Sequence, residues 1–593
     1  MQYPQLNEQS RSRIVTETFR GYDHRQRILP GQWYNEENLT AAHYPLFSQR
    51  EKRGTILTME KPLGLLAKDA LMYLDGSTVY YNGLPVAGVS LSTEDDMLPK
   101  QLVSMGAYAV IFPDRIYINT QDLSDVGSLD ARFSALSTDA VSVKLCTAEG
   151  AEYEAEASAE APSNPANGDM WIDVSGDTHV LKQYSASTSS WSEVTTVYVR
   201  IGCKGVGLNF ERGDGVKISG LSAADAGANA QLEALMGEGY QVIKERGDDY
   251  VVIVGILDSA HSQTGGLVIS RECPDMDYVT ESGNRIWGCK YGLVNGETVN
   301  EIYACKLGDP KNWRAYAGLS TDSYAVSVGS DGKFTGAITH LGYPLFFKEN
   351  CIHKIYGSLP ESYQVNTTLC RGVQDGAWRS LAIVNEVLYY QSRTDICAYD
   401  GSLPAGVSDE LGGEKYTQGA AGADGAVYYI SMRDISGGWH MFTYDTAKGL
   451  WHREDATHAL CFANVRGELM YLDADTQTLM SASGRSGTAE DDVSWSAESG
   501  IMGYEYPYSQ YLSRFNIRLK LGAGATITMC LEYDSEGGWV EMGTYTGTDA
   551  VRTLNIPVIP RRCDHLRLRL SGVGDVKIYS ISRILEGGSD VWR

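Results

Sequence analysis

The sequence lacks the features that identify many enzymes and membrane proteins. It contains no HExxH zinc motif, no Walker lysine loop and no GxSxG nucleophile elbow. Its longest apolar run, residues 250–257, is far shorter than the roughly 20 residues that cross a bilayer. The N-terminus has no apolar stretch of the kind found in signal peptides. We therefore expect neither a membrane span nor a secretion signal.

Paired cysteine motifs are also missing. The chain has eleven cysteines, an odd number, and no CxxC pair. Cysteines scattered through strand-like segments are typical of small buried hydrophobic residues, with disulfides or metal ligands as the alternative. We expect reduced cysteines, assembly in a reducing cytoplasm, and no metal or cofactor.

Basic residues are in the minority. Lys and Arg number 50 against 75 Asp and Glu, which gives a net charge of −25. Such a chain is a poor general ligand for nucleic acid, because phosphate affinity comes mainly from Lys and Arg. It would suit a surface past which DNA slides without sticking, provided that the acidic side chains face the DNA.

Short strand-like segments are abundant, together with 37 tyrosines and 63 glycines. From residue 283 to residue 455, an apolar segment with paired aromatics, a polar turn and a second strand recur. The centres of the apolar segments, Phe346, Tyr389, Tyr428 and Met470, are spaced by roughly 40 residues. A repeat of this length built only of strands is typical of propeller blades with about four strands each.

Two earlier segments repeat the pattern, around the turns Asp75–Gly76 and Pro113–Asp114. With a further repeat centred on Trp287, the count favours seven blades, with six or eight as alternatives. The sequence therefore predicts an all-β fold, a β-propeller with an inserted small α+β or β region and a C-terminal β-sandwich.

The pattern divides the chain into five parts. Residues 1–55 are Arg-rich and punctuated by proline, and are expected to be an extended docking arm or an ordinary solvated N-terminus. Residues 56–137 hold the first blades, and 138–275 form an inserted domain with a small β module and an α+β unit. The remaining blades occupy 276–483, and alternating apolar residues in 484–593 indicate the β-sandwich.

Within the insertion, Leu232 and Leu235 support one apolar helix face, which Gly237 can end. Insertions of this kind emerge on one rim of a propeller and often contact partners.

Residues with catalytic chemistry are present, but each has a simpler explanation. The acidic pairs Glu454–Asp455 and Asp491–Asp492 could serve a glycosidase, but solvated loop charges are expected in an acidic chain. His452 and His458 are the only histidines close together, and ordinary core or surface roles are favoured over metal binding. Tyr389–Tyr390 could stack on sugars, but packing between blades is favoured. We assign no catalytic, cofactor-binding or metal residue, and binding residues stay unknown.

Turn segments resemble calcium loops only in part. Asp473-Ala474-Asp475-Thr476 and Asp331-Gly332 lack the Gly and distal Glu of an EF-hand, so hairpin turns are expected.

The central segments NRIWGC, NEIYACKLGDPKNW, GAITHLGYPLFFKE and YDTAKGLWHRED resemble tailed-phage structural proteins. These are the tail nozzle, tail tubular protein B and packaged-DNA stabilisation proteins, which carry a β-propeller. The resemblance covers roughly residues 15–135 and 195–590. The segment GDMWIDVSGDTHVLKQY resembles a small β unit found within many phage structural proteins.

The resemblance implies a virion protein of the phage tail, assembled in the host cytoplasm. It implies a homo-oligomeric ring, commonly of six copies, near the distal end of a DNA conduit. The implied partners are other tail or neck proteins such as the adaptor and fibres, and genomic DNA that passes without sequence-specific binding. It implies no catalysis. The alternatives are a propeller adhesin that binds host glycans and, further off, a glycan-cleaving propeller enzyme.

Overall fold

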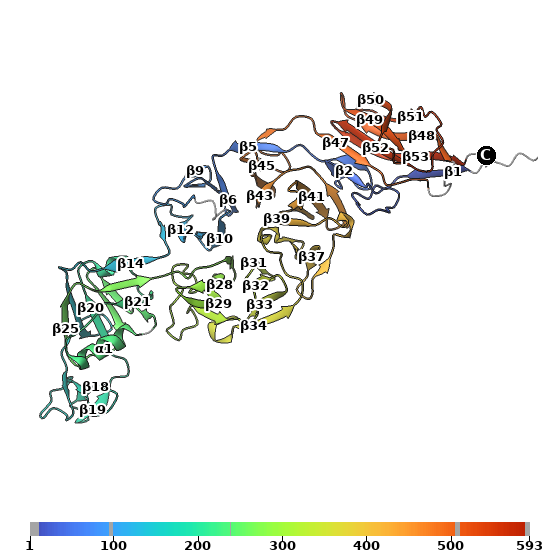
Figure 1. Ribbon diagram of the computed structural model, residues 1–593. Helices are drawn as coiled ribbons and strands as arrows, with labels where there is room; N and C mark the ends of the chain where they lie inside the picture. Colours follow the sequence, from blue (N-terminus) through green and yellow to red (C-terminus); the bar gives the residue numbers. More distant parts are fainter. Residues whose placement is uncertain (1–10, 94–98, 238, 504–509, 588–593) are drawn as a thin grey trace, which may run out of the picture.

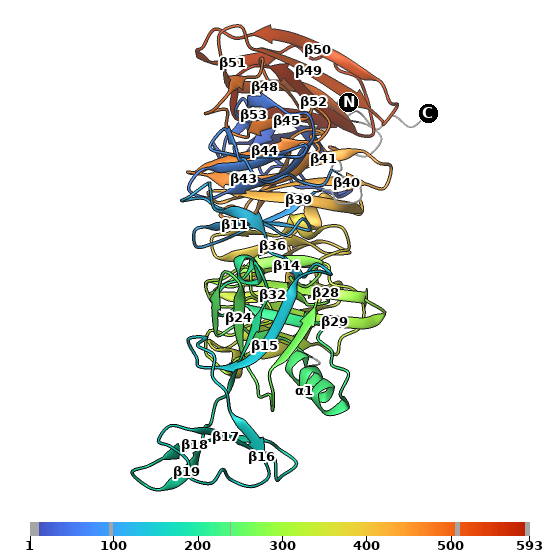
Figure 2. The same ribbon diagram turned by 90° about the vertical axis from the view of Figure 1, so that its left-hand side faces the viewer.

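The computed structural model describes residues 11–587 apart from 94–98, 238 and 504–509. The described chain is elongated (Figures 1 and 2). A two-sheet sandwich lies at one end, a ring of small sheets lies in the middle, and the insertion extends from the other side of the ring. The predicted all-β fold class, with propeller, insertion and sandwich, is confirmed.

Seven antiparallel sheets form the propeller, as the repeat count favoured. The first six are β6–β9 (Pro62–Ala67, Leu71–Asp75, Thr78–Tyr81, Leu84–Pro85), β10–β13 (Gln101–Met105, Tyr108–Phe112, Ile116–Asn119, Val126–Ser128), β27–β30 (Tyr278–Glu281, Ile286–Val294, Glu297–Ala304, Tyr324–Ser327), β31–β34 (Gly336–His340, Tyr343–Lys348, Cys351–Tyr356, Gln364–Leu369), β35–β38 (Ala382–Val384, Val387–Gln391, Ile396–Tyr399, Ala405–Gly406) and β39–β42 (Tyr416–Asp424, Val427–Asp434, Trp439–Asp445, Leu450–Arg453). The seventh combines β43–β45 (Ala459–Val465, Glu468–Asp473, Thr478–Ser481) and β46 (Thr488–Ala489) with β5 (Gly54–Thr58).

The first strand of each blade lies toward the centre of the ring, as the labels β6, β10, β31, β39 and β43 show in Figure 1. Neighbouring first strands contact one another from β43 through β6, β10 and β27 to β31. The short helix η4 (Trp378–Ser380) contacts β31 and β39 next to β35. The ring is closed by sequence-distant pairing, because β5 near the N-terminus pairs with β45 of the last blade.

The aromatic segments that define the repeat are the second strands of their blades, not the first as expected. Phe346, Tyr389, Tyr428 and Met470 lie on β32, β36, β40 and β44. The strand that precedes each of them is poorer in aromatic residues, as in the YTQGAAGAD sequence of β39.

The insertion lies between β13 and β27, and the predicted helix forms within it. This helix, α1 (Ala226–Met236), buries Leu232 and Leu235 and ends at Gly237, while the Asp225 side chain caps its first turn. The sheets around it comprise β14 (Ala131–Ser134), β15 (Ala140–Cys146), β20 (Tyr198–Gly202), β21 (Gly215–Ser219), β22 (Gln241–Val242), β23 (Glu245–Gly247), β24 (Tyr250–Val254), β25 (His261–Thr264) and β26 (Val268–Arg271). A separate small sheet, β16–β19 (Glu156–Ser158, Met170–Asp173, Val180–Ser185, Ser190–Glu193), forms the far tip in Figure 2.

The sandwich uses both ends of the chain. One sheet comprises β1 (Arg11–Thr16), β3 (Leu39–Thr40), β4 (Phe47–Gln49), β48 (Gln510–Leu521), β51 (Val551–Ile556) and β53 (Val576–Gly587); the other comprises β2 (Asn35–Glu37), β47 (Ser494–Glu498), β49 (Thr526–Tyr533), β50 (Trp539–Thr546) and β52 (Leu566–Val573). Phe19, Trp33 and Phe47 belong to the core between these sheets. Residues 1–55 were expected to form an extended docking arm. In their described part, residues 11–55, they instead form strands that pair with the sandwich and with blade seven of the same chain. The reason is that their apolar side chains complete the sandwich core.

Candidate functional site

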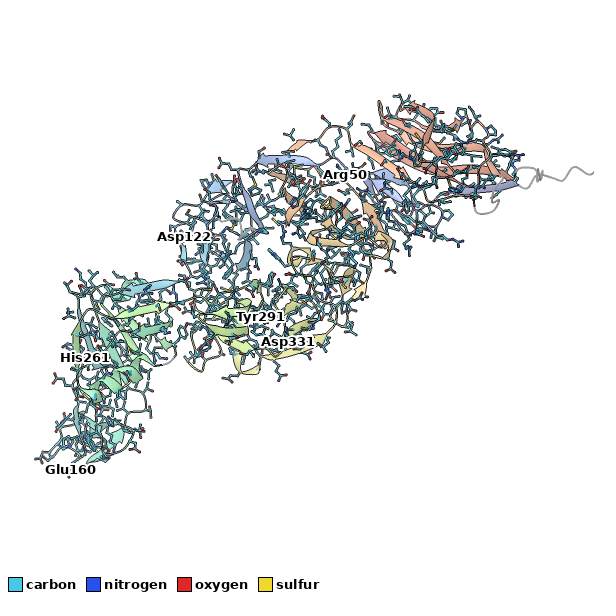
Figure 3. The ribbon with its side chains drawn as sticks, in the orientation of Figure 1. Arg50, Asp122, Glu160, His261, Tyr291 and Asp331 are labelled. Atoms are coloured by element: carbon cyan, nitrogen blue, oxygen red, sulfur yellow. The ribbon has the colours of Figure 1, made fainter. Side chains whose placement is uncertain are left out.

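Buried ion pairs join the propeller to the segment that leads into the sandwich. Arg50 and Arg53 lie between β4 and β5, and Figure 3 places Arg50 where the propeller meets the sandwich. Arg53 binds Glu454 and donates to Asp455 Oδ2 at 2.8 Å, while Arg50 binds Glu490. The arginine side chains are only 6% and 8% exposed. We name these five residues the joint cluster.

Two acidic groups of the joint cluster are held ionised. Burial raises the pKa of Asp455, but the charge of Arg53 and hydrogen bonds from Thr457 outweigh it, so the pKa lies below its ordinary value. Burial also raises the pKa of Glu490, but its hydrogen bonds with the Arg50 side chain and the Arg53 backbone outweigh burial, so this pKa too lies below its ordinary value. The acidic pair Glu454–Asp455 therefore forms ion pairs inside the structure and is not a solvated loop charge.

His452 and His458, which are close in the sequence, have different environments. His452 Nδ1 lies 2.7 Å from Glu36 Oε1, and this pair is almost fully buried between blade six and the N-terminal segment. His458 stacks on Trp439 with ring centroids 3.7 Å apart and contacts Asp475. They do not share a site. Among the residues that the structure describes, no cluster of three or more His, Cys, Asp or Glu could hold a metal ion.

The other residues that were singled out in the sequence contribute to packing, to turns or to surface ion pairs. Tyr389 contacts the Tyr428 ring of the next blade at a centroid distance of 5.4 Å, as blade packing predicts. Asp473 accepts hydrogen bonds from the backbone of Asp475 and Thr476 in a hairpin turn. Asp492 pairs with Lys52 on the surface. All eleven cysteines are free and most are buried.

A mixed aromatic and acidic cavity of about 210 Å³ lies where the N-terminal segment, blade six and the sandwich meet. Its lining is Tyr22, His24, Tyr34, Asn35, Glu414, Tyr416, Asp434, His440, Arg453 and Glu498. His440 Nε2 contacts Asp434 at 2.7 Å, while its Nδ1 is buried without a hydrogen-bond partner in the described part of the chain. We name this the junction cavity.

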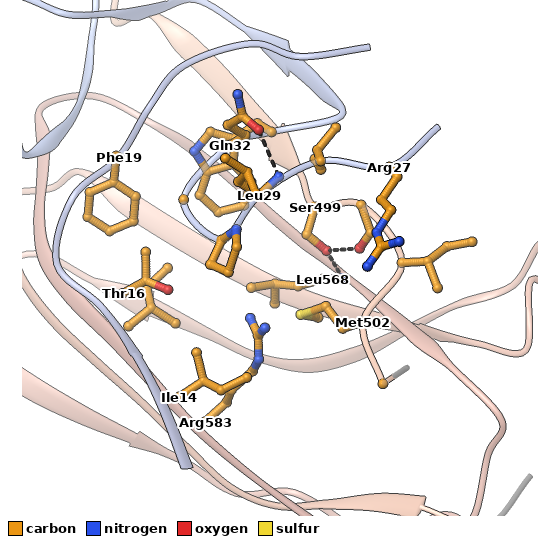
Figure 4. Close-up of a pocket in the computed structure, with 18 residues that line it drawn as sticks. Ile14, Thr16, Phe19, Arg27, Leu29, Gln32, Ser499, Met502, Leu568 and Arg583 are labelled. Atoms are coloured by element: carbon orange, nitrogen blue, oxygen red, sulfur yellow. Dashed lines mark hydrogen bonds between the residues drawn. The ribbon is translucent and has the colours of Figure 1, made fainter. Parts of the chain in front are cut away.

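A second cavity, of about 370 Å³, lies between the N-terminal segment and the sandwich (Figure 4). Ile14, Phe19 and Leu29 line one side, and Met502 and Leu568 line the other. Its wall also holds polar groups, from Thr16, Arg27, Gln32, Ser499 and Arg583.

The centre of the propeller holds a third cavity, of about 200 Å³. Inner strands of several blades line it, together with η4. Its lining is Leu65, Pro99, Lys100, Gln101, Leu102, Val279, Ala337, Ile338, Trp378, Arg379, Leu381, Ala421, Cys461 and Phe462. Burial raises the pKa of Cys461 to about 12, so its thiol is neutral at physiological pH. We name this the axial cavity.

Sequence reasoning identified the acidic pair at Glu454 but missed its partners and all three cavities. Arg53 and Glu454 lie about 400 residues apart in the chain. No local spacing connects them. The excess of arginine near the N-terminus was the available signal, since buried acids require cations nearby.

No family model matches the chain, and no curated protein matches it. Among solved structures, it is similar to an exo-β-1,3-galactanase from Phanerochaete chrysosporium with galactose, at 7% identity and a TM-score of 0.22, over 51% of this chain and 95% of the other. A second match is an engineered family 43 glycoside hydrolase with endo-xylanase and exo-arabinofuranosidase activity, at 10% identity and a TM-score of 0.20, over 53% and 97%. A third is the extracellular domain of a putative hybrid two-component system from B. thetaiotaomicron, at 7% identity and a TM-score of 0.19, over 92% and 98%.

These matches correct one expectation. The prediction that the chain is not an enzyme is contradicted, because the first matched structures are glycoside hydrolases. Similarity at these TM-scores assigns no reaction and no catalytic residue to this chain. The resemblance to phage tail proteins is not tested by these matches and stays a prediction. Among the described residues, no helix is both long and apolar enough to cross a membrane.

Proposed function

We propose that this chain is a structural subunit of a phage tail and packs with further copies of itself into a ring around the DNA conduit. The observation that carries the proposal is a set of exposed leucines on one rim of three consecutive blades. Leu319, Leu341, Leu359 and Leu403 are between 45% and 62% exposed.

Strand topology puts these leucines on the same rim. In a four-stranded antiparallel blade, the connection from first to second strand and that from third to fourth lie at one edge of the sheet. Leu341 lies in a first-to-second connection, and Leu319, Leu359 and Leu403 lie in third-to-fourth connections. The insertion follows a fourth strand and so leaves the propeller at the opposite edge, but its residues Arg212 and Lys244 line a cavity together with Leu319 of blade three.

The net negative charge of the chain favours an apolar contact between copies over a charged one. Two copies that each carry a net charge of −25 repel one another, so charged faces oppose self-association. Contiguous exposed apolar side chains are unusual on proteins that stay monomeric and mark interaction surfaces. The leucine rim supplies an uncharged surface on which a second copy can dock.

Sedimentation velocity over a range of concentrations tests the proposal. Replacing Leu341 and Leu403 together by Asp should weaken self-association about tenfold or more, because a carboxylate loses solvation in an apolar contact. Leu136→Asp is the matched control, since Leu136 is 68% exposed but lies in the insertion, away from this rim. A chain that stays monomeric at every concentration and joins no ring in assembled tails contradicts the proposal.

Carbohydrate binding is the second candidate function, and the junction cavity favours it. Tyr34 and Tyr416 are partly exposed in its wall and supply rings that can contact the apolar face of a sugar. Glu414 and Asn35 add acceptors for hydroxyl groups.

A glycan array probed with the full chain tests this second function. Tyr34→Ala should lose the signal, while Tyr291→Ala, at an exposed tyrosine on blade three, should keep it. A full chain that binds no glycan, or a Tyr34 variant that binds as well as wild type, contradicts it.

A further inference from the structure

Arg379 has an unusual position for a charged residue. It lies on η4 and lines the axial cavity, which is walled mostly by apolar side chains of the inner strands. One guanidinium nitrogen binds the Leu460 carbonyl oxygen. Its Nε is buried and has no hydrogen-bond partner among the described residues. Within the part of the chain that the structure describes, no carboxylate forms an ion pair with it.

The ammonium group of Lys100 and the amide of Gln101, which also line the cavity, are already hydrogen-bonded. Lys100 Nζ binds Asp114 and donates to Ser92 Oγ at 2.9 Å. The Gln101 amide donates to the Asp277 carbonyl at 2.7 Å and accepts from the Val279 backbone at 3.0 Å. Of the two cationic residues in the lining, Arg379 is therefore the one with donors to spare.

The Arg379 side chain is only partly exposed to solvent, and a positive charge without a counter-charge in such a place is costly, because the protein does not fully replace the lost water. Burial accordingly lowers the pKa of Arg379. An anion in the cavity would remove this cost and would form charge-assisted hydrogen bonds with the planar guanidinium.

We propose that the axial cavity binds a small organic carboxylate whose head group pairs with Arg379. A monovalent carboxylate needs no second cation, whereas a phosphate dianion needs more donors than one guanidinium offers. The walls formed by Leu65, Val279 and Ile338 suit an apolar body attached to that head group. The volume of about 200 Å³ limits the ligand to a small molecule.

Isothermal titration of the full chain with benzoate tests the proposal, with benzamide as the neutral isostere and inorganic phosphate as the alternative anion. Benzoate should bind in a one-to-one ratio, more tightly than either comparison compound. Arg379→Gln should weaken benzoate binding about tenfold or more, through loss of charged hydrogen bonds. Arg393→Gln is the matched control, because Arg393 is 69% exposed and lies outside the cavity.

Thermal unfolding supplies a second readout that does not depend on the Gln variant folding well. Arg379→Met keeps much of the side-chain volume and removes the charge, so without ligand its Tm should equal or exceed that of wild type. Benzoate should raise the Tm of wild type and leave that of the Met variant unchanged.

Three results overturn the proposal. The first is the absence of benzoate binding to the wild-type chain, and the second is equal binding to the Arg379→Gln chain. The third is phosphate binding as tight as benzoate and equally dependent on Arg379, which would replace the carboxylate by an inorganic anion.

Discussion

At the residue scale, the cost of burying charge determines which ion pairs contribute to the stability of the fold. Arg53 is 6% exposed and pairs with Glu454 and Asp455, so removing it leaves these poorly solvated acidic groups with only the longer contacts to Arg50, at 4.0 and 3.7 Å. Lys52, its neighbour, pairs with Asp492 where both side chains are largely in solvent. Lys52 and Arg53 are adjacent in the sequence, but only Arg53 is expected to contribute strongly to the stability of the fold.

Replacing Arg53 by Met should lower the free energy of unfolding by about 3–5 kcal/mol, because Glu454 and Asp455 lose the closer of their two arginine partners. Urea unfolding followed by tryptophan fluorescence measures the change. Lys52→Met is the control and should stay close to wild type. Equal effects at the two positions would show that the joint cluster does not stabilise the contact between the propeller and the sandwich.

The same cluster predicts sensitivity to acid. Asp455 and Glu490 have folded-state pKa values below their ordinary ones, so the unfolded chain binds more protons than the folded chain as the pH falls. Their stabilisation is complete above the unfolded pKa, about 4, and is lost as the pH falls through the lower folded values. Urea unfolding as a function of pH should show this loss, and Arg53→Met should show a shallower one. An identical pH dependence in the variant would contradict the assignment.

At the element scale, the sequence predicted the blades but not how the ring closes. The second strands of the blades have room for paired aromatic residues such as Tyr389 and Tyr390, and these pairs make the repeat recognisable in the sequence. First strands crowd around the axis and carry small residues, as in β39, so they give a weak pattern. The pairing of β5 with β45 joins residues more than 400 positions apart in the sequence, which no local periodicity reports. For the same reason Arg379 could not be recognised, since only closure of the ring encloses it.

The pairing of both chain ends predicts that residues 484–593 do not fold alone. That fragment lacks β1 to β4, and it lacks Phe19, Trp33 and Phe47 from the sandwich core. Edge strands and buried area are both lost, so a cooperative thermal transition should be absent from its near-UV circular dichroism. Residues 11–49 joined ahead of the fragment should restore the transition. A cooperative transition in the fragment alone would contradict this prediction.

At the scale of the whole molecule, two terms oppose each other when copies associate. Every copy carries a net charge of −25, and the repulsion between copies acts over a Debye length of about 10 Å at 0.1 M salt. The leucine rim contributes an attraction that salt does not screen. The sign of the salt effect therefore identifies which term holds the copies together.

Added salt should strengthen self-association of the wild-type chain. Screening removes the repulsion between acidic surfaces, whereas the apolar contact through Leu341 and Leu403 keeps its strength. Sedimentation velocity at several sodium chloride concentrations measures the association constant, and the double Asp variant should stay weakly associated throughout. An association constant that falls as salt rises would mean that ion pairs join the copies. The acidic surface would then be part of the interface, and the leucine rim would have to face a different protein.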